Sequence, residues 1–106
     1  DKILMLNNAW YSVISPESCS SILWRSWEHK EQAASALKLT PTDMQGFGLV
    51  DDVIKEPVDG AHRNHEAIFS EVKTNILAYL KELEPMHPSD RITKRIEKFN
   101  QMGVWQ

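Results

Sequence analysis

The chain has 106 residues, of which 42% are hydrophobic and 25% charged, and its formal net charge is −3. This length corresponds to one small domain or a piece of a larger one, and the composition excludes disordered and collagen-like chains. The scattered basic residues do not indicate nucleic-acid binding, no apolar run approaches the roughly 20 residues of a membrane span, and no secretory signal is visible. The single cysteine, Cys19, excludes an internal disulfide and favours a reducing, cytoplasmic location.

Two apolar runs near the beginning predict a pair of short strands. They are KILML at 2–6 and WYSVI at 10–14, and Asn7 and Asn8 between them favour a turn. The chain opens without an initiator Met and leads directly into strand-like residues, which predicts a fragment of a longer protein. Three aromatic side chains are expected in the core or at an interface: Trp10, Trp24 and Trp27.

Strand chemistry changes to helix chemistry at Ser15-Pro16-Glu17. Serine is a good N-cap, proline suits the first helical position, and the acid faces the positive end of the helix dipole, so a helix is expected over 16–24. Within it, Cys19 is expected to be a buried packing thiol. Because α/β folds place ligands where a strand leads into a helix, Glu17 is a candidate site residue. The commoner role of such an acid is to satisfy the first N–H groups of the helix.

The middle of the chain predicts two more helices and a strand. The Ala-rich run 29–38 has helical periodicity. Thr40, Pro41 and Asp43 are typical of the start of a further short helix. LVDDVI at 49–54 then reads as a strand.

The segment PVDGAHR at 57–63 predicts a loop around Gly60. Arg63, with His62 beside it, could contact an anionic group, because arginine pairs with carboxylate or phosphate through a two-pronged fork. The alternative is an exposed loop with a charge that precedes a helix.

The last third of the chain is predicted to be helical. Residues 64–84 carry apolar side chains every three or four positions, and Ser89 or Asp90 is expected to cap a final helix over 89–102. The order of strands, helices, a strand and helices predicts an α/β fold with a helical C-terminal tail. The spacing of the histidines and of Cys19 fits no metal site, so none is expected, and no glycine-rich phosphate loop is present.

The opening stretch, DKILMLNNAWYSVISPESCSSILW, resembles the family of bacterial acetyl-CoA carboxylase carboxyltransferase alpha subunits, where it usually reads YSVISPEGCASILW. The resemblance continues through EQAASALKLTPTDMQGFGLVDDVIKEP into DGAHRNHEA, where the family has a Gly-Gly-Ala-His-Arg loop. Ser15-Pro16-Glu17 and the segment 40–53 are also similar to the wider crotonase superfamily. The resemblance implies a crotonase-like (ClpP/crotonase) fold. Residues 1–63 would form the C-terminal part of the carboxyltransferase domain, and 64–106 a helical region that packs on the domain or at the subunit interface.

The resemblance also implies a function. In this family a carboxyl group passes from carboxybiotin, held on a biotin carboxyl carrier protein, to acetyl-CoA, which forms malonyl-CoA for fatty acid biosynthesis. The implied partners are the carboxyltransferase beta subunit in a heterotetramer, the carrier protein and biotin carboxylase, within an ATP-dependent complex. The glycine-rich loop that stabilises the reacting oxyanions is expected before residue 1, so no catalytic residue is assigned here and the fragment alone is expected to be inactive. The implied substrate-binding positions are Ser15, Pro16, Glu17, His62 and Arg63.

The sequence departs from the family pattern at Ser18 and at Val58-Asp59, where glycine and Leu-Gly are usual. Two other functions are kept open. One is a crotonase-type acyl-CoA hydratase or isomerase that uses Glu17 as acid and base. The other is a non-enzymatic module whose helices over 64–84 and 89–102 bind a partner.

Overall fold

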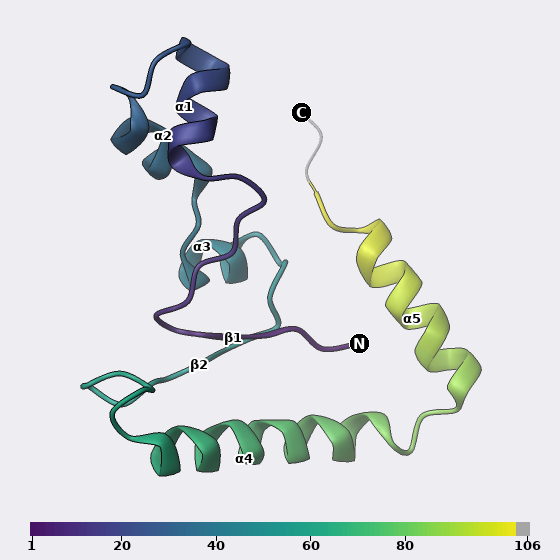
Figure 1. Cartoon of the computed structure of the whole chain (residues 1–106). Helices are drawn as coiled ribbons and strands as arrows, with labels where there is room; N and C mark the ends of the chain where they lie inside the picture. The colour runs from purple at the N-terminus through teal and green to yellow at the C-terminus, as the bar shows by residue number, and fades with distance from the viewer. Residues whose placement is uncertain (104–106) are drawn as a thin grey trace.

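The computed structural model of this chain describes residues 1–103. It is a mixed α/β structure, as expected, and the final residues of the predicted region 64–106 lie outside the described part (Figure 1). The elements in chain order are β1 (Leu4–Leu6), α1 (Pro16–Trp24), α2 (Lys30–Leu37), α3 (Pro41–Gly46), β2 (Asp52–Ile54), α4 (His65–Leu83) and α5 (Pro88–Asn100).

The two strands form a parallel sheet. Their register pairs Leu4 with Asp52, and Leu6 with Ile54. Parallel strands need a long crossover, and here it carries α1, α2 and α3. Both strands therefore end at the same edge of the sheet, on the left in Figure 1.

A small apolar cluster holds α3 on the sheet. Met5 of β1 packs with Met44 of α3 and with Val50, and all three are buried. Met5 is the buried member of β1, and its two strand neighbours are only half-buried. A separate packing centre joins α1 to α2, where Ala33 is completely buried. Cys19 is buried on α1, as predicted for a packing thiol.

Two predicted helix starts are confirmed. The Ser15 side chain accepts a hydrogen bond from the Ser18 N–H at 3.1 Å, and Pro16 occupies the first turn of α1. At α3, Thr40 and Asp43 form a reciprocal capping box. Each cap satisfies backbone donors that the first helical turn leaves without an intrahelical partner.

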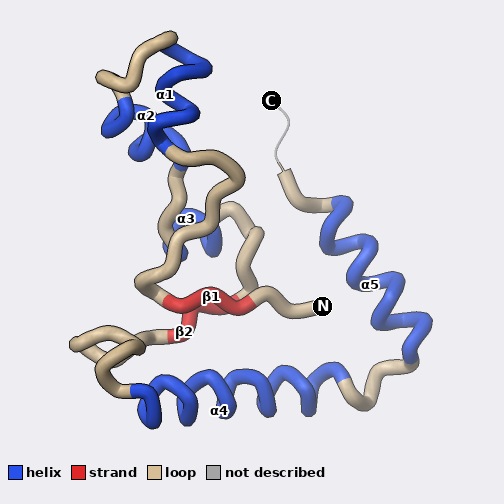
Figure 2. The backbone as a smooth tube through the Cα atoms, viewed as in Figure 1, coloured by secondary structure: helices blue, strands red, loops and turns tan. Residues whose placement is uncertain are grey.

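The prediction of a strand at 10–14 is wrong: Figure 2 shows this segment as loop. The Tyr11 N–H donates to the Leu39 carbonyl at 3.2 Å, a contact with a connecting segment and not with a strand. A strand needs a partner strand to which its backbone can hydrogen-bond. The β-branched composition of the segment 10–14 therefore does not by itself produce a strand here. Trp10 and Trp27 are 74% and 69% exposed, so they are not core residues of this chain.

The predicted cap of the last helix is also wrong. α5 begins at Pro88 with His87 as its N-cap, not with Ser89 or Asp90. The His87 imidazole accepts from the Ser89 N–H at 3.4 Å. Proline at the first helical position has no N–H to satisfy, so the helix starts there and the cap falls on the residue before it.

The chain spreads into a flat shape of 52 × 40 × 17 Å. In Figure 1, α4 runs beneath the sheet and α5 turns back past the start of the chain. Among the described residues, no helix has both the length and the apolar character needed to cross a membrane.

Candidate functional site

The candidate site lies at the carboxyl edge of the parallel sheet. Asn7 and Asn8 follow β1 directly, and Lys55 and Glu56 follow β2. The loop 57–63 then leaves from this edge toward α4 (Figure 1). In α/β folds this edge is where ligands bind.

Asn7 and Glu56 link the two strand ends to each other. The Asn7 side-chain oxygen accepts from the Glu56 N–H at 2.7 Å, and the Asn7 N–H donates to the Ile54 carbonyl at 2.9 Å. In return, one Glu56 carboxylate oxygen accepts from the Asn8 N–H at 2.8 Å. The other accepts from the Ala61 N–H at 3.3 Å, within the loop. Glu56 thus contacts both the end of β1 and the loop that follows β2.

The loop is built from two successive turns around Gly60. The Gly60 N–H donates to the Pro57 carbonyl at 2.8 Å, and the Arg63 N–H donates to the Gly60 carbonyl at 3.2 Å. Gly60 has a φ of +86°, where glycine is favoured, and a Cβ there would lie 3.0 Å from the His62 ring. The His62 imidazole therefore lies close over the glycine.

His62 and Arg63 are both exposed on this loop. None of the ion pairs formed within residues 1–103 includes Arg63. Its guanidinium is consequently accessible to an anionic group from solution or from a partner.

Ser15, Pro16 and Glu17 lie at the start of α1. Ser15 and Pro16 line a hollow of about 290 Å³ together with apolar neighbours that include Trp10 and Val13. Glu17 does not line this hollow, and its side chain is exposed. The described chain shows no enclosure around Glu17 of the kind that usually tunes an acid–base carboxyl group.

The five predicted site positions fall into two separate groups. In Figure 1 the start of α1 lies beyond α3, whereas the loop 57–63 lies on the opposite side of the sheet, next to α4. Within this chain, Glu17 is therefore not brought to His62 and Arg63. That these five positions contact a substrate stays a prediction.

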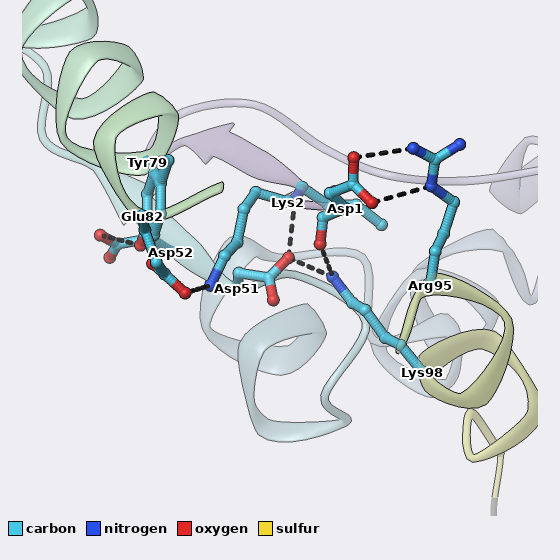
Figure 3. A network of polar contacts seen from close by, with 9 residues as sticks. Asp1, Lys2, Asp51, Asp52, Tyr79, Glu82, Arg95 and Lys98 are labelled. Atoms are coloured by element: carbon cyan, nitrogen blue, oxygen red, sulfur yellow. Dashed lines mark hydrogen bonds and ion pairs between the residues drawn. The ribbon is translucent and has the colours of Figure 1, made fainter. Parts of the chain in front are cut away.

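A second polar cluster occupies the amino edge of the sheet (Figure 3). Lys98 on α5 donates to the Asp51 carboxylate and, at 3.0 Å, to the Asp1 carbonyl. Arg95 binds the Asp1 carboxylate with two nitrogens, at 2.9 and 2.7 Å. The cluster lies opposite the loop 57–63 and joins α5 to residues that precede both strands, which is a structural role.

α4 joins the same cluster through Tyr79 and Glu82. Lys2 donates to Glu82 at 2.8 Å and lies 5.0 Å from the centre of the Tyr79 ring. The hydrogen bond to Glu82 raises the pKa of Lys2. Burial, followed by the hydrogen bond to Asp52, raises the pKa of Tyr79. Both shifts favour the protonated forms that make these contacts.

Asp51 is the acidic centre of the cluster. Its carboxylate also accepts from the Ile3 N–H at 2.6 Å. Burial raises the pKa of Asp51, but the hydrogen bonds from Lys98 and from the Ile3 N–H together lower it below its ordinary value. Asp51 is evident in the sequence, but its partner is not, because Lys98 lies 47 residues away along the chain.

An apolar hollow lies between the segment 11–13, α3 and α5, with a volume of about 310 Å³. Phe99 and Met102 supply one wall and Leu39 and Met44 another. It offers little for chemistry, since its lining is almost entirely apolar. Among residues 1–103, no three His, Cys, Asp or Glu side chains come together as a possible metal site.

Sequence reasoning proposes His62 and Arg63 as candidates but does not include Asn7, Asn8 or Glu56, which lie at the same edge of the sheet. The sequence predicts only a turn at Asn7-Asn8, and it gives no role to Glu56, which stands between the predicted strand 49–54 and the predicted loop 57–63. The available signal was that polar residues follow two strands of one α/β pattern, since carboxyl ends of parallel strands share an edge.

The chain is similar to known carboxyltransferase subunits. The family described as "Acetyl co-enzyme A carboxylase carboxyltransferase-like" matches residues 1–103. Curated proteins named acetyl-coenzyme A carboxylase carboxyl transferase subunit alpha are similar to this chain over nearly its whole length. The relative from Pelodictyon phaeoclathratiforme is 54% identical over 105 residues, 99% of this chain and 31% of the relative. That from Flavobacterium johnsoniae is 53% identical over 106 residues, 100% of this chain and 33% of the relative. The chain thus spans about a third of the length of these relatives.

Proposed function

Because this chain belongs to the acetyl co-enzyme A carboxylase carboxyltransferase-like family, we propose that it works as part of the carboxyltransferase component of acetyl-CoA carboxylase. The observation that carries this proposal is the family match across residues 1–103, together with the 54% identity to an alpha subunit. The reaction would move a carboxyl group from carboxybiotin, on its carrier protein, to acetyl-CoA, and the product would be malonyl-CoA.

The loop 57–63 would take part by presenting a cation. The thioester oxygen of acetyl-CoA and the ureido oxygen of biotin both gain negative charge during such a transfer, and the substrates carry carboxylate and phosphate groups. Arg63 is an exposed guanidinium without an ion-pair partner among the described residues, and His62 adds two ring nitrogens beside it. This supports a role in holding an anionic group of a substrate.

The start of α1, which lies on the other side of the sheet from the loop 57–63, would form the wall of a separate substrate-binding region (Figure 1). Ser15 and Pro16 line a hollow, and exposed Glu17 gives no sign of the burial expected of an acid–base group. We therefore assign these residues to the wall, without a proton-transfer step. The oxyanion donors would come from a part of the protein that corresponds to the unmatched two-thirds of its relatives.

The proposed assembly follows from the same family membership. The carboxyltransferase beta subunit, the biotin carrier protein and biotin carboxylase would be partners in the cytoplasm. Residues 1–63 would belong to a crotonase-like domain and 64–106 to a helical region packed on it or on a neighbouring subunit. Apolar side chains left exposed on α4 and α5 support the packing role: Phe69, Ile76, Leu77, Leu80, Ile92, Ile96 and Phe99.

The test is a carboxyltransferase assay of the full-length protein, assembled with the beta subunit. The complex should convert malonyl-CoA and biocytin to acetyl-CoA and carboxybiocytin. Arg63→Gln should raise KM for a substrate, whereas Lys73→Gln, which removes an exposed charge from α4, should not. A folded complex without this conversion would refute the assignment.

A further inference from the structure

We propose that Glu56 is a positioning residue, whose carboxylate braces the loop 57–63 against the end of β1 and thereby sets how His62 and Arg63 face a substrate anion. This inference rests on the proposed function, and it adds a residue outside the implied set. All the hydrogen bonds that support it lie among residues 1–103.

Glu56 connects the end of β1 to the loop 57–63 through its side chain. Its Oε2 accepts from the N–H of Asn8, 48 residues earlier, and its Oε1 accepts from the N–H of Ala61, five residues later. Its own N–H donates to the Asn7 side-chain oxygen at 2.7 Å. The three bonds form a closed link between the end of β1, the end of β2 and the loop.

The chemistry of this link requires two acceptor oxygens. Both donors are backbone N–H groups of segments outside the strand ladder, and an ionised carboxylate supplies acceptors only. No ion pair formed within residues 1–103 includes Glu56, so the described contacts of its carboxylate are these amides. Each carboxylate oxygen accepts one backbone N–H, so the carboxylate links the end of β1 to the loop.

The contact at Ala61 lies directly before His62 and Arg63. The backbone-to-backbone bonds of the loop are internal, from Gly60 to Pro57 and from Arg63 to Gly60. Internal turns give the loop its shape, but they do not fix its direction relative to the sheet. The bond from Ala61 to Glu56 does so, because Glu56 is itself held to the end of β1.

Amide hydrogen exchange measures the brace without reference to activity. In the full chain, Glu56→Ala should accelerate exchange at the amides of Asn8 and Ala61 by about tenfold or more, because both lose their acceptor. Glu56→Gln keeps one oxygen and should affect one of the two amides more than the other. Glu97→Gln removes an exposed charge on α5 and serves as the matched control. Unchanged exchange at both amides in Glu56→Ala, with α4 still protected, would overturn the inference.

Asn7 provides a second pair of variants. Asn7→Asp keeps the acceptor for the Glu56 N–H, whereas Asn7→Ala removes it. Accelerated exchange at the Ala61 amide in Asn7→Ala, with the aspartate variant close to wild type, supports a link that runs through Glu56. Equal behaviour of the two variants would contradict it.

The assembled carboxyltransferase tests the consequence for function. Glu56→Ala should lower kcat/KM by about tenfold, mainly through KM, as expected for a residue that supports a binding group. In an Arg63→Gln background the same substitution should have little further effect. Full additivity of the two losses would refute positioning through Arg63. An inactive wild-type complex would instead refute the proposed function, and the exchange measurements would still decide the brace.

Discussion

Removal of the Asp51 carboxylate should weaken the attachment of α5 to the sheet. The carboxylate accepts from Lys98 on α5 and from the Ile3 N–H at 2.6 Å, and its side chain is only 24% exposed. Asp51→Ala removes the acceptor of the Ile3 N–H and leaves the Lys98 ammonium with the Asp1 carbonyl alone. Asp51→Asn keeps an oxygen and loses the charge.

The magnitude follows from the number and exposure of these bonds. Hydrogen bonds to charged groups contribute about 1.5–3 kcal/mol each, and about a quarter of each side chain remains in contact with solvent, which weakens the pair. We expect Asp51→Ala to lower the free energy of unfolding by about 2 kcal/mol, and Asp51→Asn by about 1 kcal/mol. With a urea m-value of about 2 kcal/mol/M, the larger loss moves the midpoint by about 1 M.

Urea unfolding of the full chain, followed by tryptophan fluorescence and circular dichroism, measures both values. The matched control is Asp59→Asn, an exposed aspartate in the loop 57–63, which should leave the midpoint unchanged. A midpoint for Asp51→Ala equal to wild type would show that the ion pair contributes nothing to folding.

The pH dependence gives an independent check on Asp51. Its pKa is lower in the folded chain than the ordinary value of 3.8, so the unfolded state binds the proton more readily. The contribution is therefore fully present above the ordinary pKa and is lost as pH falls through the folded pKa. The difference in stability between wild type and Asp51→Asn should stay constant from about pH 7 to about pH 5 and shrink below about pH 4. A difference that grows on acidification would refute the linkage.

Three further substitutions test other parts of the chain. Ser20 is completely buried and donates to the Ser26 carbonyl, so Ser20→Ala should cost about 1–2 kcal/mol in urea unfolding; a neutral result would mean that water replaces the hydroxyl. Gly60→Ala should destabilise the chain by about 1 kcal/mol or more because of its positive φ and the nearby His62 ring. Gly46→Ala, with no atom within 4 Å of the added Cβ, should not, so equal effects would contradict the strain at Gly60. Glu17→Gln in the assembled enzyme separates two chemistries, since a loss of turnover by about a hundredfold or more would indicate acid–base catalysis and a smaller loss favours carboxyl transfer.

Local sequence signals predicted most of the helices because the relevant interactions are local. Ser15 with Pro16, and Thr40 with Asp43, cap helices through bonds that span three residues, so they can be recognised from spacing alone. The strand prediction at 10–14 failed for the opposite reason. A strand exists only where another part of the chain supplies its ladder, and the composition of one segment does not say whether it does.

The candidate site shows the same division. His62 and Arg63 were predicted from their chemistry and from the family pattern, and the structure places them on an exposed loop. Glu56 could not be assigned a role, because its donor at Asn8 is 48 residues away and becomes a neighbour only through the parallel pairing of β1 with β2.

By itself, the sequence determined the family, the mixed α/β class and the helix starts. These depend on motif identity and on contacts within a turn. Only the tertiary structure decided which residues share an edge of the sheet: Glu56 bracing the loop at the carboxyl edge, and Lys98 holding Asp51 at the amino edge. The physical reason is that Glu56 with Asn8, and Lys98 with Asp51, are pairs of residues about 50 positions apart. Contacts that close the chain over such a distance produce no periodic pattern in the sequence.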